Sequence, residues 1–162
     1  MTYETPQSHS APVAASMHEE ARQQMGGMLE EFVETVPGVT HALLVSRDGL
    51  RLVDSKVHRD AADRWAATLG SLASLCESIP GPRGDRGGLK LALVERENAL
   101  IFASIAGSSA VFPNQPGSVS GSVATVLAVI AGPETNAGTV GFEMGRLVDR
   151  FAPYMVESVR SA

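Results

Sequence analysis

The fold can be inferred most directly from residues 36–55, whose sequence is Val36-Pro-Gly-Val-Thr-His-Ala-Leu-Leu-Val-Ser-Arg-Asp-Gly-Leu-Arg-Leu-Val-Asp-Ser55. Pro37 and Gly38 end a preceding helix, because proline cannot continue a helix and glycine is common just after one. Residues 42–45 are all apolar and predict a strand, and Asp48-Gly49 supplies the residues that a tight hairpin turn needs. The stretch therefore predicts a helix end, a strand, a turn and a second strand, with no reactive group among them.

The composition indicates one domain and argues against general binding to nucleic acid or to anionic membranes. A chain of 162 residues with 44% hydrophobic content is long enough for one core. The net charge of -5 argues against nucleic acid and anionic membranes, which both require a dense basic face. No apolar run approaches the roughly 18 residues of a membrane span. The single cysteine, Cys76, suits a reducing compartment, so the cytoplasm is the expected location, and partners could recruit the protein to a membrane surface.

A helix is predicted before the hairpin, over residues 20–36. Its large apolar residues recur at spacings of three and one, which places them on one helix face. Gly26 and Gly27 weaken the start of this helix by roughly 1 kcal/mol each relative to alanine. Residues 1–19 contain few large apolar side chains and are expected to form a disordered tail.

A second helix is predicted from Asp60, as its N-cap, to Ser78. Several alanines keep much of its surface small, which permits close approach of a neighbouring element. Pro80-Gly81-Pro82 ends this helix, and the glycine-rich residues 81–88 are expected to form a mobile loop.

Three further strands and a last helix complete the domain, which is expected to span residues 20–158, with 159–162 as a short tail. The strands are predicted at 89–95, 99–106 and 122–131, with a long loop insertion over about 107–121. Asn136 opens the last helix and Pro153 bends or ends it. The large apolar residues expected to be buried by this helix are Phe142, Leu147, Val148, Phe151 and Met155. The order α-β-β-α-β-β-β-α predicts an α+β domain with a five-stranded, mostly antiparallel sheet covered by helices on both faces.

No pattern in the chain indicates catalysis, a cofactor or a metal. There is no P-loop motif, and the glycines of 81–88 follow a helix rather than a strand. Gly117-Ser-Val-Ser-Gly121 has valine where a nucleophile elbow has its serine. The four histidines lack the pairing of metal ligands. Cys76 is expected in the core, with a reactive thiol as the alternative. The chain is therefore predicted not to be an enzyme.

Trp65, the only tryptophan, has two interpretations. It could anchor the second helix on the sheet, or it could anchor a protein interface together with the neighbouring Arg64 and Thr68, because tryptophan and arginine are enriched at interfaces.

Three segments resemble the Roadblock/LC7 domain. They are Phe-Val-Glu-Thr-Val-Pro-Gly-Val with the following hairpin at 32–50, Leu-Gly-Ser-Leu-Ala-Ser-Leu at 69–75, and Ala-Val-Ile-Ala-Gly-Pro with Val-Gly-Phe-Glu-Met at 128–144. The likeness covers residues 24–156 and is nearest to the stand-alone bacterial members, including gliding-protein-B-like regulators of Ras-like GTPases and those found in actinobacterial conservon operons. About ten extra residues around 112–121 depart from the family pattern.

The resemblance implies a profilin-like fold and a homodimer in which the middle helices pack together and strands 89–95 pair across the axis. It also implies binding to a Ras-like small GTPase, with possible GTPase activation, and association with a sensor kinase-like protein. The alternative is a small-molecule-sensing domain, or an adaptor domain of a sensor kinase complex without GTPase regulation. The residues implied at the dimer or GTPase interface are Arg64, Trp65, Thr68, Leu72, Leu75, Leu89, Leu91 and Leu93.

Overall fold

The computed structural model of the chain describes residues 10–109 and 123–155. Within these residues the helices and strands follow one another in the predicted order. They are α1 (Ser10–Thr35), β1 (Val39–Ser46), β2 (Arg51–Asp54), α2 (Arg59–Ser78), β3 (Ala92–Glu95), β4 (Leu100–Ser109), β5 (Val123–Ala131), α3 (Ala137–Arg150) and the 3₁₀ turn η1 (Ala152–Tyr154).

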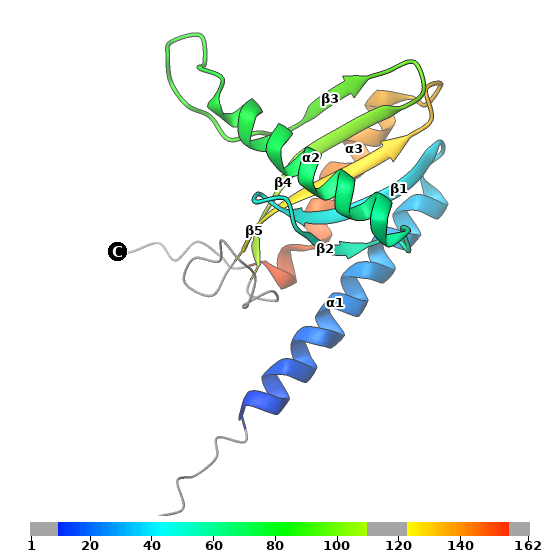
Figure 1. The fold of residues 1–162 in the computed structure, drawn as a ribbon, viewed down its shortest axis with the longest axis vertical. Coiled ribbons are helices and arrows are strands. Elements are labelled where there is room, and N and C mark those ends of the chain that lie inside the picture. The colour runs from blue at the N-terminus through cyan, green and yellow to red at the C-terminus, as the bar shows by residue number, and fades with distance from the viewer. Residues whose placement is uncertain (1–9, 110–122, 156–162) are drawn as a thin grey trace, which may run out of the picture.

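The strands described here form one sheet of five in the order β2-β1-β5-β4-β3, and all neighbouring pairs are antiparallel. Helices α1 and α3 lie on one face of the sheet and α2 lies on the other (Figure 1). The predicted α+β class, with helices on both faces, is confirmed. The two edges of the sheet are β2 and β3.

The core has two halves, one on each face of the sheet. Leu43 and Leu44 are both fully buried, yet Leu44 packs in the half under α1 and α3, whereas Leu43 packs in the half under α2. Neighbouring strand residues point to opposite faces, so an uninterrupted apolar run is what a strand covered on both sides requires.

The hairpin between β1 and β2 forms as predicted, and α2 packs directly on its turn. Gly49 has a φ of +89°, which glycine adopts without strain, and the Ser46 N–H donates to the Leu50 carbonyl at 2.8 Å. A Cβ on Gly70 of α2 would lie 2.8 Å from the Ser46 carbonyl oxygen and 3.0 Å from Gly49. The small helix surface seen in the sequence therefore serves the approach of α2 to this turn.

The first helix begins earlier than the sequence predicted. Residues 10–19, expected in a disordered tail, belong to α1, and the helix runs on through Gly26 and Gly27. Met25 and Leu29, on either side of the glycine pair, are fully buried, and this packing outweighs the propensity cost of the glycines. The N-terminal half of α1 projects beyond the sheet (Figure 1). Residues 1–9 and 156–162 lie outside the described residues.

The N-cap of α2 is His58 and not Asp60 as predicted. The helix starts at Arg59, and the His58 ring nitrogen accepts from the Asp60 N–H at 3.3 Å. Asp60 instead lies in the first turn, where a carboxylate still interacts favourably with the helix dipole. The N-cap of α3 is Asn136, as predicted, and its side chain accepts from the Thr139 N–H at 2.9 Å.

Phe142 is not buried by α3 as expected but is 67% exposed. The buried residues of this helix recur at spacings of four and three, and a residue two positions after Val140 lies on the opposite side. The helix ends at Arg150, and Pro153 lies in η1. The buried stripe consists of Val140, Met144, Leu147 and Phe151.

Two strand boundaries differ from the predicted ones. β3 covers only 92–95, because residues 89–91 leave the ladder and the Leu89 N–H donates to a Glu77 side-chain oxygen of α2. β4 continues past the predicted end at 106 to Ser109, through a register shift at Gly107, whose φ is +89°. The rest of the predicted insertion, residues 110–122, lies outside the described residues.

Candidate interaction surface

The two flanks of α2 differ sharply in chemistry. The polar flank faces the β1–β2 hairpin: Asp63 lies 3.3 Å from Arg51, and Glu77 pairs with Arg47. Successive residues of a helix are rotated by about 100° around its axis, which places Leu75 and Ile79 on the other flank. Their side chains are 65% and 66% exposed. Isolated exposed leucines are ordinary, but two large apolar side chains about one helical turn apart make this flank a candidate interaction surface.

The sheet ends beside this apolar flank. β3 pairs with β4 on one side, and no other strand within 10–109 and 123–155 pairs with its outer side. An unpaired edge offers backbone N–H and C=O groups to a further strand. We define the α2–β3 surface, which lies beside the open β3 edge, as Trp65, Leu72 and Leu75 of α2, its C-cap residue Ile79, Leu89, and Ile101 of β4.

The structure divides the predicted interface residues between the two faces of the sheet. Arg64, Trp65, Thr68, Leu72 and Leu75 lie on α2, and Leu89 packs on the same core half. The other two lie on the α3 side. Leu93 pairs with Phe102 of the α1/α3 core half, and a Cβ on Gly141 of α3 would lie 3.1 Å from a methyl of Leu91.

Two members of the α2–β3 surface were not among the residues predicted from the sequence. Ile79 follows Leu72 and Leu75 by seven and four residues, so helical spacing was a sufficient signal for it. Ile101 alternates with two residues buried on the other face, Leu100 and Phe102, which was a weaker signal.

Trp65 has features of both an anchor of α2 on the sheet and an anchor of a protein interface. It is half-buried and packs on the α2 side of the core, and its ring centroid lies 4.8 Å from that of His41 on β1. Burial lowers the pKa of His41 below its usual 6.5, because desolvation disfavours the charged imidazole. Arg64 and Thr68 beside it are exposed, and the Thr68 hydroxyl donates to the Arg64 carbonyl at 2.9 Å.

The described residues offer no cluster for metal chemistry. No group of three or more histidine, cysteine, aspartate or glutamate residues among them could hold a metal ion. Cys76 is free and half-buried on α2, outside the fully buried core. No helix in the described part of the chain combines the length and the apolar character needed to cross a bilayer.

The order of the elements and the pairing of the strands match the fold predicted from the sequence, and a family model supports the same fold. The model of the Roadblock/LC7 domain matches residues 25–112. The chain belongs to the Roadblock/LC7 domain family. The resemblance seen in the sequence is thereby confirmed.

Solved structures extend the comparison. A Roadblock/LC7 domain from Streptomyces avermitilis shares 37% identity with this chain, covers 78% of it and 93% of its own length, and superposes with a TM-score of 0.64. A second Roadblock/LC7 domain from the same organism shares 26% identity over 78% of this chain and 97% of its own, with a TM-score of 0.57.

A gliding protein, MglB from Thermus thermophilus, shares 16% identity over 82% of this chain and 89% of its own, with a TM-score of 0.61. At that identity the likeness shows a shared fold. A sequence search of curated proteins finds no match to this chain.

Proposed function

We propose that this protein is a non-catalytic homodimeric regulator that binds a Ras-like small GTPase in a bacterial signalling system. The observation that supports it most directly is the α2–β3 surface: exposed apolar side chains beside an unpaired strand edge in a member of the Roadblock/LC7 family. An exposed apolar surface next to an open edge favours association with another folded protein over binding of a small substrate.

The first partner on this surface is a second copy of the chain. Antiparallel pairing of two β3 edges would continue the sheet from one protomer into the next, and would satisfy the backbone groups left open at each edge. The apolar flanks of the two α2 helices would then meet across the axis, which buries Leu75 and Ile79.

Two substitutions of exposed apolar residues by aspartate test this dimer. We expect Leu75→Asp with Ile79→Asp to weaken dimerisation more than about 100-fold, because the loss of roughly 3 kcal/mol of apolar burial corresponds to that factor. Met17→Asp is the matched control: Met17 is 64% exposed, as exposed as the two test residues, but it lies on α1. Analytical ultracentrifugation distinguishes the outcomes, and a wild-type protein that sediments as a monomer at about 100 µM contradicts the proposed dimer.

The second partner is a Ras-like GTPase. The family resemblance supports this step, and such a regulator acts by ordering the loops of the GTPase around its nucleotide. The test is to purify the dimer with a Ras-like GTPase encoded beside it, loaded with GDP or a GTP analogue, and to measure both binding and GTP turnover. Absence of a complex in both nucleotide states would refute the proposed partner, whereas a complex with unchanged turnover would indicate recruitment rather than activation.

A further inference from the structure

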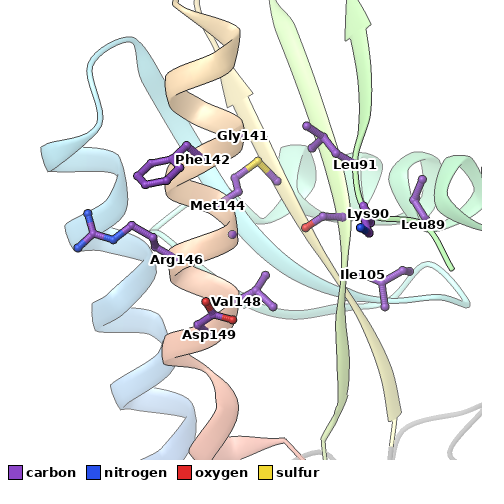
Figure 2. Close-up of a pocket in the computed structure, with 12 residues that line it drawn as sticks. Leu89, Lys90, Leu91, Ile105, Gly141, Phe142, Met144, Arg146, Val148 and Asp149 are labelled. Carbon is purple, nitrogen blue, oxygen red and sulfur yellow. The ribbon is translucent and has the colours of Figure 1, made fainter.

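A cavity of about 590 Å³ opens between α3 and the outer part of the sheet, on the side of α3 away from α1 (Figure 2). Its helix wall is formed by residues 141–149, its floor by Ser104 and Ile105 of β4, and its far wall by residues 89–91. Residues 89–91, which form the far wall, do not pair with β4. It is separate from the α2–β3 surface, apart from Leu89, which borders both.

Two residues of this cavity are unfavourable choices by local rules, and no contact among the described residues accounts for them. Gly145 lies in the interior of α3, where glycine is unfavourable relative to alanine, and a Cβ there would meet nothing within 4 Å. Ser104 is only 5% exposed, and its hydroxyl has no hydrogen-bond partner within the described parts of the chain. Buried hydroxyls without a partner are unfavourable and rare. Gly141 is different, because its missing side chain admits Leu91.

These two residues meet at one cavity, and departures from local rules that cluster in space are typical of functional sites. Gly145 leaves room beside the helix, and Ser104, which lines the floor, has a buried hydroxyl without a partner among the described residues. The walls between them are mainly apolar, with Leu91, Met144 and Val148 directed between the helix and the strands (Figure 2). A pocket of this size with mainly apolar walls and a few polar groups is a common form of ligand site.

The charges around the cavity do not select an ion. Lys90 lies on the strand side and Asp149 on the helix side, so the two walls carry opposite charges. Arg146 is directed away from β4 in Figure 2 and lies 3.4 Å from Glu143. Among the described residues that line the cavity, the buried polar group without a partner is the Ser104 hydroxyl.

We propose that this cavity binds a small, mainly apolar, uncharged molecule that carries one hydrogen-bonding group, as an aromatic alcohol or amine does. The apolar body occupies the space between α3 and Leu91, and the polar group bonds to the Ser104 hydroxyl. This inference does not depend on the proposed GTPase regulation.

The test uses the fluorescent probe N-phenyl-1-naphthylamine, which has two aromatic groups and a single N–H, with 1-naphthol as a competitor. We expect saturable binding of one probe per protomer that 1-naphthol displaces. Gly145→Leu should fill the cavity and weaken binding at least tenfold. Ser104→Ala should weaken binding roughly threefold to tenfold, which is the usual worth of one neutral hydrogen bond, and it should raise the melting temperature without the probe.

Matched controls separate the cavity from other apolar surfaces. Gly27→Leu places the same side chain at an exposed position of α1, where a Cβ also meets nothing within 4 Å, and should bind the probe as wild type does. The Leu75→Asp, Ile79→Asp variant should also retain binding, since it alters only the α2–β3 surface. Circular dichroism confirms that each variant is folded.

Three results would overturn the proposal. They are the absence of saturable binding, unchanged binding by folded Gly145→Leu, and loss of binding in the α2–β3 variant. Loss of GTPase binding in Gly145→Leu without any probe binding to the wild type would instead assign the cavity to a protein partner.

Discussion

Alanine at position 70 would place a methyl group against the backbone of the hairpin turn. The added Cβ would lie 2.8 Å from the Ser46 carbonyl oxygen and 3.0 Å from both Cα and N of Gly49. All three contacts are to backbone atoms, so no side chain can rotate to relieve them. The helix would have to move away from the turn, and α2 would lose part of its packing on β1.

The net effect combines two terms of opposite sign. Overpacking of this kind costs about 1–3 kcal/mol. Replacing glycine by alanine in a helix interior raises the free energy of unfolding by up to about 1 kcal/mol. Gly27→Ala isolates the second term, because a Cβ on Gly27 of α1 meets nothing within 4 Å. We therefore expect the free energy of unfolding of Gly70→Ala to lie about 1–3 kcal/mol below that of Gly27→Ala.

Urea and thermal unfolding, followed by circular dichroism at one fixed protomer concentration, measure this difference. At this chain length it corresponds to a melting temperature roughly 2–12 °C lower for Gly70→Ala than for Gly27→Ala. If Gly70→Ala proves as stable as Gly27→Ala, then α2 does not approach the hairpin turn as closely as described, and the account of Gly70 is wrong.

Two further predictions concern local contacts. Because the pKa of His41 is lowered in the folded state, the unfolded chain binds a proton at this residue more readily than the folded chain does. The contribution of neutral His41 to the free energy of unfolding is therefore fully present above pH 6.5. This contribution is lost as the pH falls from 6.5 through the folded-state pKa. His41→Phe should flatten the dependence of unfolding free energy on pH in this window, and an unchanged slope would count against burial of the imidazole. Asn136→Ala should lower the free energy of unfolding by about 1 kcal/mol, because it removes the hydrogen bond that caps α3. Asn136→Asp, which keeps an acceptor there, should lose much less in the same urea titration.

Several features of the candidate site could be predicted from residues close together in the chain. Trp65, Leu72 and Leu75 were assigned to the interface from the family resemblance, and their helical spacing is itself a sufficient signal for an apolar flank of α2. The assignment of Leu91 and Leu93 to the same surface could not be checked in this way. Which face of the sheet they occupy depends on where residues 89–91 leave the ladder, and a single-residue change of register reverses every side chain.

Local sequence patterns were enough to predict the order of helices and strands, the hairpin at Asp48-Gly49 and the end of α1 before Pro37, because turn chemistry and hydrophobic period are local properties. The open edge of the sheet, the exposure of Phe142 and the meeting of Gly145 and Ser104 at one cavity instead follow from long-range packing. These features depend on β5 pairing with β1, which lies far earlier in the chain, and on α3 packing across β4. Such contacts join residues whose proximity no local pattern encodes.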